Sequence, residues 1–174
     1  MIKKLGIFAA CALLALSLGG CSTQSKVSAD LAIIGTVIGL AQSDIPSLVS
    51  AGTLSASDGT ALGDYLGGAD ALLGQAQVCV NTLGSGGKAV DLLSCVNDFG
   101  VGLLSPSEQA DLRLISPAAQ SQVTIYVTAI VLADNVAIAL LGGTPVAIPV
   151  VGSAPAASAA DMAAFKVRLH LKKY

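Results

Sequence analysis

Apolar residues recur along the chain at the three- and four-residue spacing of amphipathic helices, between short polar turns. The first helical segment carries this pattern on one face: Leu31, Ile34, Ile38 and Ala41. Ser28 supplies a cap for a helix that begins near Ala29, and Gly52 ends it. Pro46 either bends this helix or begins a second short helical piece.

Two more helices are predicted on either side of a glycine-rich turn. Ser55 and Asp58 form a variant of the capping box, so a helix begins after Ser55 and runs to about Thr82. Residues 84–87, Gly-Ser-Gly-Gly, are the clearest turn in the chain. The helix after it has regularly spaced apolar residues and is expected to fade near two glycines: Val90, Leu93, Val96 and Val101, with Gly100 and Gly102.

Two Ser-Pro pairs mark the next helix starts, because serine caps a helix and proline fits its first turn. The pair at 105–106, with Glu108 as a capping-box acid, begins a short helix. The pair at 116–117 begins the longest apolar helix, over about residues 118–141. Glycines and a proline then stop this helix.

The C-terminal part departs from the helical pattern. Residues 144–157 contain three prolines among Ala, Val and Gly, which excludes a regular helix and predicts an extended segment along the bundle. In the basic segment 158–174, apolar and charged residues alternate over 165–172 as in a strand, yet a helical face fits nearly as well. Helix is preferred there because the rest of the chain is helical.

These patterns predict an all-α protein, a single small bundle of four to six helices over residues 28–143. Hydrophobic residues make up 53% of the chain but aromatic residues only 3%, so the core must consist of Ala, Leu, Val and Ile. Charged residues are 11%, less than half the usual share. Intrinsic disorder is excluded, because it accompanies low hydrophobicity and high charge.

The N-terminus has the features of an export signal. Lys3 and Lys4 precede an apolar run over residues 5–18, and small residues follow. Leu18-Gly19-Gly20-Cys21 resembles the lipobox of bacterial lipoproteins. In that family the signal is removed before the cysteine, whose thiol carries a diacylglycerol and whose new amino group is acylated. The resemblance implies that residues 1–20 are cleaved and that Cys21 is the membrane anchor.

The resemblance also implies a location. Removal of the signal leaves 154 of the 174 residues, joined to the lipid through a polar tether over residues 21–27. Ser22, rather than Asp, follows the cysteine. In lipoproteins similar to those of Gram-negative bacteria, this residue implies transfer to the periplasmic side of the outer membrane. An ordinary signal peptide cut elsewhere, or an uncleaved anchor helix, is the alternative interpretation.

Cys79 and Cys95 each lie eight residues from Gly87, so a turn there between antiparallel helices places them at the same height. Exported proteins meet oxidising conditions. We therefore predict a disulfide, which stabilises by roughly 3 kcal/mol in the chain-entropy model. Two free buried thiols are the alternative. A metal site is disfavoured, since His170 is the only histidine and the cysteine spacing matches no zinc pattern. No cofactor is expected.

Charge and hydropathy indicate which classes of partner the chain could bind. Residues 27–165 contain eleven acids against two bases, and four bases without an acid follow. An acidic body argues against nucleic-acid binding. The basic tail either contacts anionic lipid or, more simply, keeps the C-terminus soluble. Residues 123–141 are long enough to cross a membrane, but Asp134 and Asn135 near the middle favour a buried bundle helix.

No motif points to catalysis. Residues 84–88 do not complete a phosphate loop, because positions 82 and 89 are Thr and Ala. A single histidine leaves no partner set for a serine or cysteine nucleophile. Asp91 with Asp98, and Asp134 with Asn135, could bind a cation weakly, although scattered acids on the wet sides of helices are commoner.

We therefore expect a lipid-anchored envelope lipoprotein that is not an enzyme and has a structural or partner-binding role. Its partners would be the membrane, through the N-terminal lipid, and an envelope protein. The mature chain is similar in composition to uncharacterised Ala/Gly-rich helical lipoproteins. The alternative is a carrier that holds a lipid or small hydrophobic ligand among aliphatic side chains, where aromatic filler is lacking.

Overall fold

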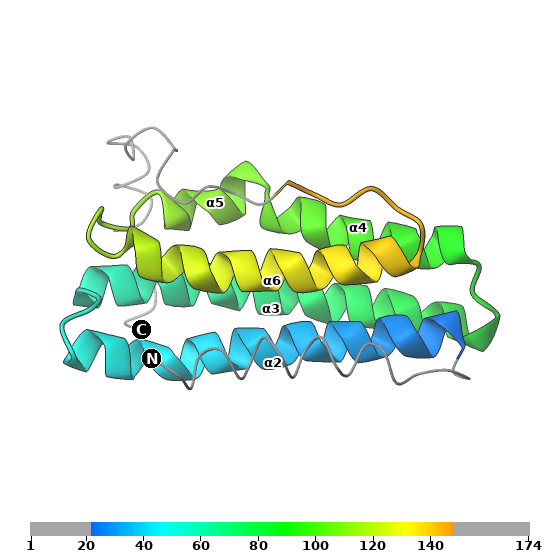
Figure 1. Cartoon of the computed structure of the whole chain (residues 1–174), viewed down its shortest axis with the longest axis horizontal. Helices are drawn as coiled ribbons and strands as arrows, with labels where there is room; N and C mark the ends of the chain where they lie inside the picture. Colours follow the sequence, from blue (N-terminus) through cyan, green and yellow to red (C-terminus); the bar gives the residue numbers. More distant parts are fainter. Residues whose placement is uncertain (1–21, 148–174) are drawn as a thin grey trace, which may run out of the picture.

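The structure, a computed structural model, describes residues 22–147. Within this range the chain forms five α-helices, one short 3-10 helix and no strand (Figure 1). This confirms the prediction of an all-α bundle. The elements follow in the order α2 (Thr23–Ser50), α3 (Ala56–Leu83), η1 (Gly84–Gly86), α4 (Ala89–Leu103), α5 (Pro106–Leu112) and α6 (Gln120–Leu140).

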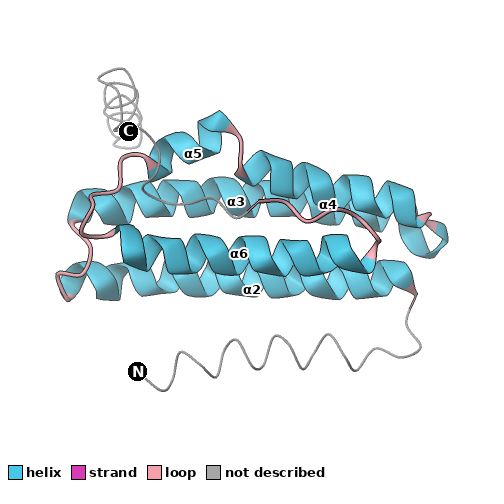
Figure 2. Cartoon of the chain, turned by 45° about the horizontal axis from the view of Figure 1, so that its top comes forward, coloured by secondary structure: helices cyan, strands magenta, loops and turns pink. Residues whose placement is uncertain are grey.

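Four sides of the bundle are formed by α2, α3, α4 and α6, and each helix runs antiparallel to its neighbours (Figure 1). Both α2 and α4 pack against α3 and against α6, so α3 and α6 lie on opposite corners. The shorter α4 ends part-way along α3, and α5 then packs on the remaining length of α3 (Figure 2). The helices therefore form two layers, α2 with α6 and α3 with α4 and α5.

The core is aliphatic, as the composition predicts. Tyr65 and Phe99 are the only aromatic side chains buried in the described part of the chain. Glycines let helices approach closely: a Cβ atom on Gly35 would lie 3.2 Å from a methyl carbon of Leu73. Apart from Cys95, the remaining core consists of leucine, isoleucine, valine and alanine.

The first helix begins earlier than predicted. It starts at Thr23, not near Ala29, and Ser22 rather than Ser28 is its cap. The Ser22 hydroxyl accepts a hydrogen bond from the Ser25 N–H at 3.2 Å. Burial of Val27 against the core then favours helix in a segment that polar composition alone marks as a tether. The predicted tether over residues 21–27 is thus wrong from Thr23 onward.

The other end of α2 follows the sequence more closely. The helix passes through Pro46 without ending, so no second helical piece begins there. Gly52 has a φ of +70° and follows Ala51, the C-cap of the helix. The N–H of Thr53 donates to the Leu48 carbonyl at 2.9 Å, which satisfies a carbonyl at the helix end.

Two later helices differ from expectation. α4 does not fade at Gly100 but runs to Leu103, because close packing at its glycines replaces the helix propensity they lack. α5 begins as predicted, with Ser105 as cap and Pro106 in its first turn. α6 begins at Gln120 with no side-chain cap, so the predicted capping role of Ser116 is wrong.

Beyond α6 the chain is extended. Gly142, with a φ of +74°, follows the helix end, and residues 143–147 turn back along the bundle (Figure 1). This agrees with the extended segment predicted over 144–157 as far as residue 147. The remainder of that segment, the C-terminal segment 158–174 and its open choice between helix and strand lie outside the described residues.

Candidate functional site

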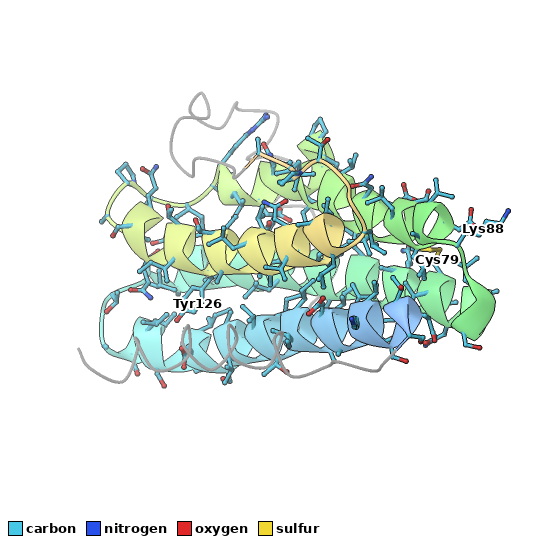
Figure 3. All side chains as sticks on the ribbon, turned by 45° about the vertical axis from the view of Figure 1, so that its right-hand side comes forward. Cys79, Lys88 and Tyr126 are labelled. Carbon is cyan, nitrogen blue, oxygen red and sulfur yellow. A yellow bond between two sulfur atoms is a disulfide. The ribbon has the colours of Figure 1, made fainter. Side chains whose placement is uncertain are left out.

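Of the predicted site residues, Cys79 and Cys95 are brought together. They form a disulfide between α3 and α4 with a Cα–Cα distance of 5.8 Å. The bond closes the hairpin whose tip is η1, near Lys88 (Figure 3). Cys95 is buried, whereas Cys79 is exposed. The equal spacing of both cysteines from Gly87 therefore predicted the bridge correctly, and the alternative of two free thiols is wrong.

The predicted lipid-attachment residue, Cys21, lies outside the described residues. The residue that follows it, Ser22, is the cap of α2. Residues 23–27 of the predicted tether are therefore part of the first helix, and only Ser22 separates Cys21 from that helix. An anchor at Cys21 would hold α2 by its first turn.

A buried carboxylate at the other end of the bundle joins the start of α3 to the loop before α6. Asp58 completes the capping box of α3, accepting from the N–H of Ser55 at 3.1 Å while its own N–H donates to the Ser55 hydroxyl. Its other oxygen accepts from the N–H of Ser116 at 2.7 Å. The Ser116 hydroxyl adds a bond of 2.9 Å to Oδ2.

These bonds determine the ionisation of Asp58. Burial disfavours the charged form and would raise the pKa of the carboxyl. The hydrogen bonds from Ser116 and Ser55 outweigh burial and hold the pKa below its ordinary value of 3.8. Asp58 is consequently a charged group that fixes two chain segments 58 residues apart, a structural role rather than a reactive one.

A second buried carboxylate, Asp134, has the opposite environment. It lies on the inward side of α6, fully buried, and neither oxygen has a hydrogen-bond partner within the described part of the chain. Its Oδ2 occupies the space that a Cβ atom on Gly100 of α4 would take. Burial raises the pKa of Asp134 to about 7, because a low-dielectric interior disfavours the charged form.

The extended segment after α6 covers this carboxylate. Asn135 donates from Nδ2 to the Val146 carbonyl at 3.0 Å and accepts from the Val146 N–H at 2.7 Å. Val146 also lies 3.4 Å from the Cβ position of Gly100. The amide of Asn135 thus fixes the returning segment over the point where Asp134 meets α4.

Two tyrosine hydroxyls also differ in whether they have a hydrogen-bond partner. Tyr126 of α6 donates to Oδ2 of Asp44 on α2 at 2.9 Å, across the seam between these helices (Figure 3). The hydroxyl of Tyr65 is buried and has no hydrogen-bond partner among the described residues. Burial, followed by the negative charge of Glu108, raises the pKa of Tyr65 above its ordinary value. Both phenols stay neutral at physiological pH.

The remaining polar candidates do not converge. Asp91 and Asp98 are exposed on α4, and Asp134 points inward from α6. The described residues contain no cluster of three or more His, Cys, Asp or Glu that could hold a metal ion. The polar groups that do meet across the bundle hold segments together rather than surround an opening.

Two helices have the length and hydropathy of membrane spans. They are α2 and α6, and only the second has a predicted counterpart, in residues 123–141. A signal sequence or the core helix of a soluble protein passes the same test. Asp30 and Asp134 are buried within these helices on their inward sides, which fits helices that pack against a protein core.

Comparisons of the chain with protein-family models, with curated proteins and with solved structures found no match. Two contacts described above escaped the sequence analysis, namely Asp58 with Ser116 and Asn135 with Val146. A signal existed for the second, since Asn135 stands in the most apolar helix and needs a polar partner.

Proposed function

We propose that this protein is a lipoprotein of the bacterial cell envelope, anchored through lipid on Cys21, with a non-enzymatic structural or partner-binding role. The observation that carries the proposal is the lipobox-like stretch Leu18-Gly19-Gly20-Cys21, which ends one residue before the cap of α2. Signal cleavage there would leave α2 intact and place the lipid at its first turn.

The disulfide supports export. A bond between Cys79 and Cys95 persists in the periplasm and outside the cell, whereas the cytosol keeps thiols reduced. Ser22 after the cysteine further favours the periplasmic side of the outer membrane as the final location. An envelope protein is the partner that this location makes available to the folded domain.

The placement of interior polar groups supports a non-enzymatic role. Asp58 and Asn135 both form hydrogen bonds with the backbone of another segment. A catalytic site instead needs a nucleophile or base that faces a substrate. The hydrogen bonds of these groups stabilise the arrangement of the helices. A domain stabilised in this way is suited to presenting a fixed surface to a partner.

Replacing Cys21 with Ser tests the anchor. We expect the wild-type protein to sediment with membranes and to carry diacylglycerol and acyl mass on a chain that begins at residue 21. The variant should appear in the soluble periplasmic fraction without that mass. The double variant Cys79→Ser, Cys95→Ser is the control, since it loses the disulfide but keeps Cys21 and should stay in the membrane. Unchanged fractionation of Cys21→Ser would contradict the anchor.

Crosslinking of the lipidated protein in its own envelope, followed by mass spectrometry, tests the partner. A partner-binding role predicts one envelope protein enriched over a sample of the Cys21→Ser variant. Crosslinks confined to lipid and to abundant outer-membrane proteins in proportion to their abundance would contradict a specific protein partner.

A further inference from the structure

The layer formed by α2 and α6 exposes apolar side chains to solvent. We define the α2–α6 face by its five large exposed apolar residues: Leu40 of α2, with Ile125, Leu132, Val136 and Leu140 of α6. Each is between 43% and 48% exposed. The four on α6 recur at intervals of seven and four residues, which places them along one side of that helix.

The same face has few charges. α2 and α6 contain four ionisable acids and bases, of which Asp30 and Asp134 are buried. Lys26 lies at the Cys21 end of α2. Asp44, near the far end, accepts the hydrogen bond of Tyr126. Between Lys26 and Asp44 the exposed surface of both helices is therefore without charge.

The opposite layer also exposes valines at positions 78, 90 and 101, but it carries more of the exposed acids. Asp70 on α3, and Asp91 and Asp98 on α4, are exposed. A surface that contacts an anionic bilayer has to avoid such acids, because the membrane surface repels negative charge. The two layers thus differ in charge, and the layer with an uncharged stretch between Lys26 and Asp44 is the one that continues from Cys21.

The attachment point lies at one end of this face. Cys21 is followed directly by the cap of α2, so lipid on Cys21 would hold the first turn of α2 at the membrane without a spacer. Only two orientations remain for the bundle, upright on this end or lying on a side that includes α2. The exposed apolar residues of the α2–α6 face favour lying down, because they are stabilised by removal from water.

We propose that the protein lies on its lipid bilayer with the α2–α6 face against the membrane and the acidic α3–α4 layer away from it. This inference rests on the proposed lipid anchor. Lys26 faces the headgroup region near the anchor, where a cation is favoured. A second copy of the chain is the competing occupant, but Cys21 brings the face to lipid rather than to another protein.

Tryptophan placement tests the orientation, since the chain has no tryptophan of its own. Leu132→Trp puts the fluorophore on the α2–α6 face. The matched control, Val78→Trp, puts it on the outer side of α3, at an exposed apolar position on the opposite corner of the bundle. Both lipidated full-length variants are reconstituted into phosphatidylcholine–phosphatidylglycerol vesicles whose acyl chains are brominated near the headgroup.

We expect brominated lipid to reduce the emission of Leu132→Trp by about twofold, because a face lying in the interface is buried to the depth of those bromines. The emission of Val78→Trp should be unchanged. Circular dichroism checks that each variant is folded, and Val136→Trp replaces Leu132→Trp if that variant fails to fold. Equal quenching of both positions, or none at either while the vesicles retain the protein, overturns the orientation and leaves the anchor in place.

The unlipidated Cys21→Ser background distinguishes the other occupants. If Leu132→Trp is shielded there in a concentration-dependent manner and lipid does not quench it in the lipidated chain, a second copy covers the face and the proposal is wrong. Shielding that does not depend on concentration, again without quenching, shows that the chain covers itself and overturns the proposal too. Loss of the wild-type protein from vesicles contradicts the anchor itself.

Discussion

Two of the buried carboxylates in the described part of the bundle have opposite environments. Asp58, at the end where α3 begins, receives hydrogen bonds from Ser55 and Ser116 and has a lowered pKa. Asp134, in the middle of α6, receives none in the described structure and has a pKa of about 7. Both side chains are almost inaccessible to solvent, but Asp134 lies deeper in the bundle and also lacks the donors that stabilise the charge of Asp58.

Ionisation therefore has opposite effects on the free energy of unfolding at these two positions. A carboxylate with several donors stabilises the segments that supply them, and its removal leaves those donors unsatisfied. A carboxyl without donors is tolerated only in its neutral form. Asp58 therefore stabilises the fold when charged, whereas Asp134 does so only when protonated.

The largest expected effect is a loss of stability as the pH rises. Asp134 has an ordinary pKa of 3.8 and a pKa of about 7 in the bundle, so the folded state binds the extra proton. Its contribution is full below the unfolded pKa and is lost as the pH rises through the folded pKa, by roughly 4 kcal/mol in all. Urea unfolding curves recorded at about one-unit pH intervals between pH 4 and pH 8 measure this change in the free energy of unfolding.

Two other acids bear on that pH profile. Burial raises the pKa of Asp30, so its contribution has the same sign as that of Asp134. Asp58 has the opposite sign: its contribution is present above the unfolded pKa of 3.8 and is lost as the pH falls through its lower folded pKa. The control is Asp134→Asn, whose profile should be much flatter above pH 4. A profile parallel to that of the wild type would contradict the assignment.

Replacing Asp58 with Ala should have the next largest effect. The change removes the capping box of α3 and leaves the Ser116 N–H without its acceptor, so we expect a loss of about 3 kcal/mol at pH 7. Asp70→Ala is the matched control, because Asp70 is an exposed aspartate of the same helix, and its effect should be small. Equal midpoints for the two variants in urea would show that Asp58 is not a structural joint.

Gly100→Ala tests how closely α4 packs against the Asp134 carboxyl. A Cβ atom there would meet Oδ2 of Asp134 and come within 3.4 Å of Val146, so we expect a loss of about 2 kcal/mol in spite of the better helix propensity of alanine. Gly67→Ala is the control, since nothing lies within 4 Å of its Cβ position on α3. That change should stabilise by about 1 kcal/mol.

A double-mutant cycle tests whether the loss of stability in Gly100→Ala comes from contact between the new Cβ atom and the Asp134 carboxyl. Combining Gly100→Ala with Asp134→Ala should recover most of the loss, because the smaller side chain makes room on α4. Additive effects in this double-mutant cycle would place the cost elsewhere.

The smallest predicted effect is that of Ser116→Ala. Only the hydroxyl bond to Asp58 is lost, because the backbone N–H of residue 116 still donates. A loss of about 1 kcal/mol is expected. Ser121→Ala, at an exposed serine in the first turn of α6, should change the unfolding midpoint less. A larger loss at residue 121 would contradict the role of Ser116.

Local features of the fold could be predicted from the sequence. The capping box of Ser55 and Asp58 spans four residues and was confirmed, as was the bridge between Cys79 and Cys95, whose symmetry about a turn fixes their heights. The lipobox at Cys21 and the carrier alternative stay predictions. Local patterns work here because each depends on neighbours close in the chain.

What escaped prediction depended on contacts between distant segments. Ser116 before a proline has the local pattern of a cap, but Asp58 competes for its hydroxyl from 58 residues away. The polar start of α2 has the pattern of a tether, but the core buries Val27 and makes it helical. Neither Asp58 nor the core is visible within a few residues of the segment that it changes.

If Cys21 carries the proposed lipid anchor, the early start of α2 limits how far the protein would extend from a membrane. A helix of 28 residues measures about 42 Å at ~1.5 Å per residue, and only Ser22 stands between its first residue and Cys21 in the sequence. Lying flat, the bundle would project by little more than the thickness of two helices. Its partners would then be proteins embedded in, or resting on, the same bilayer, and structures across the periplasmic gap would be beyond its reach.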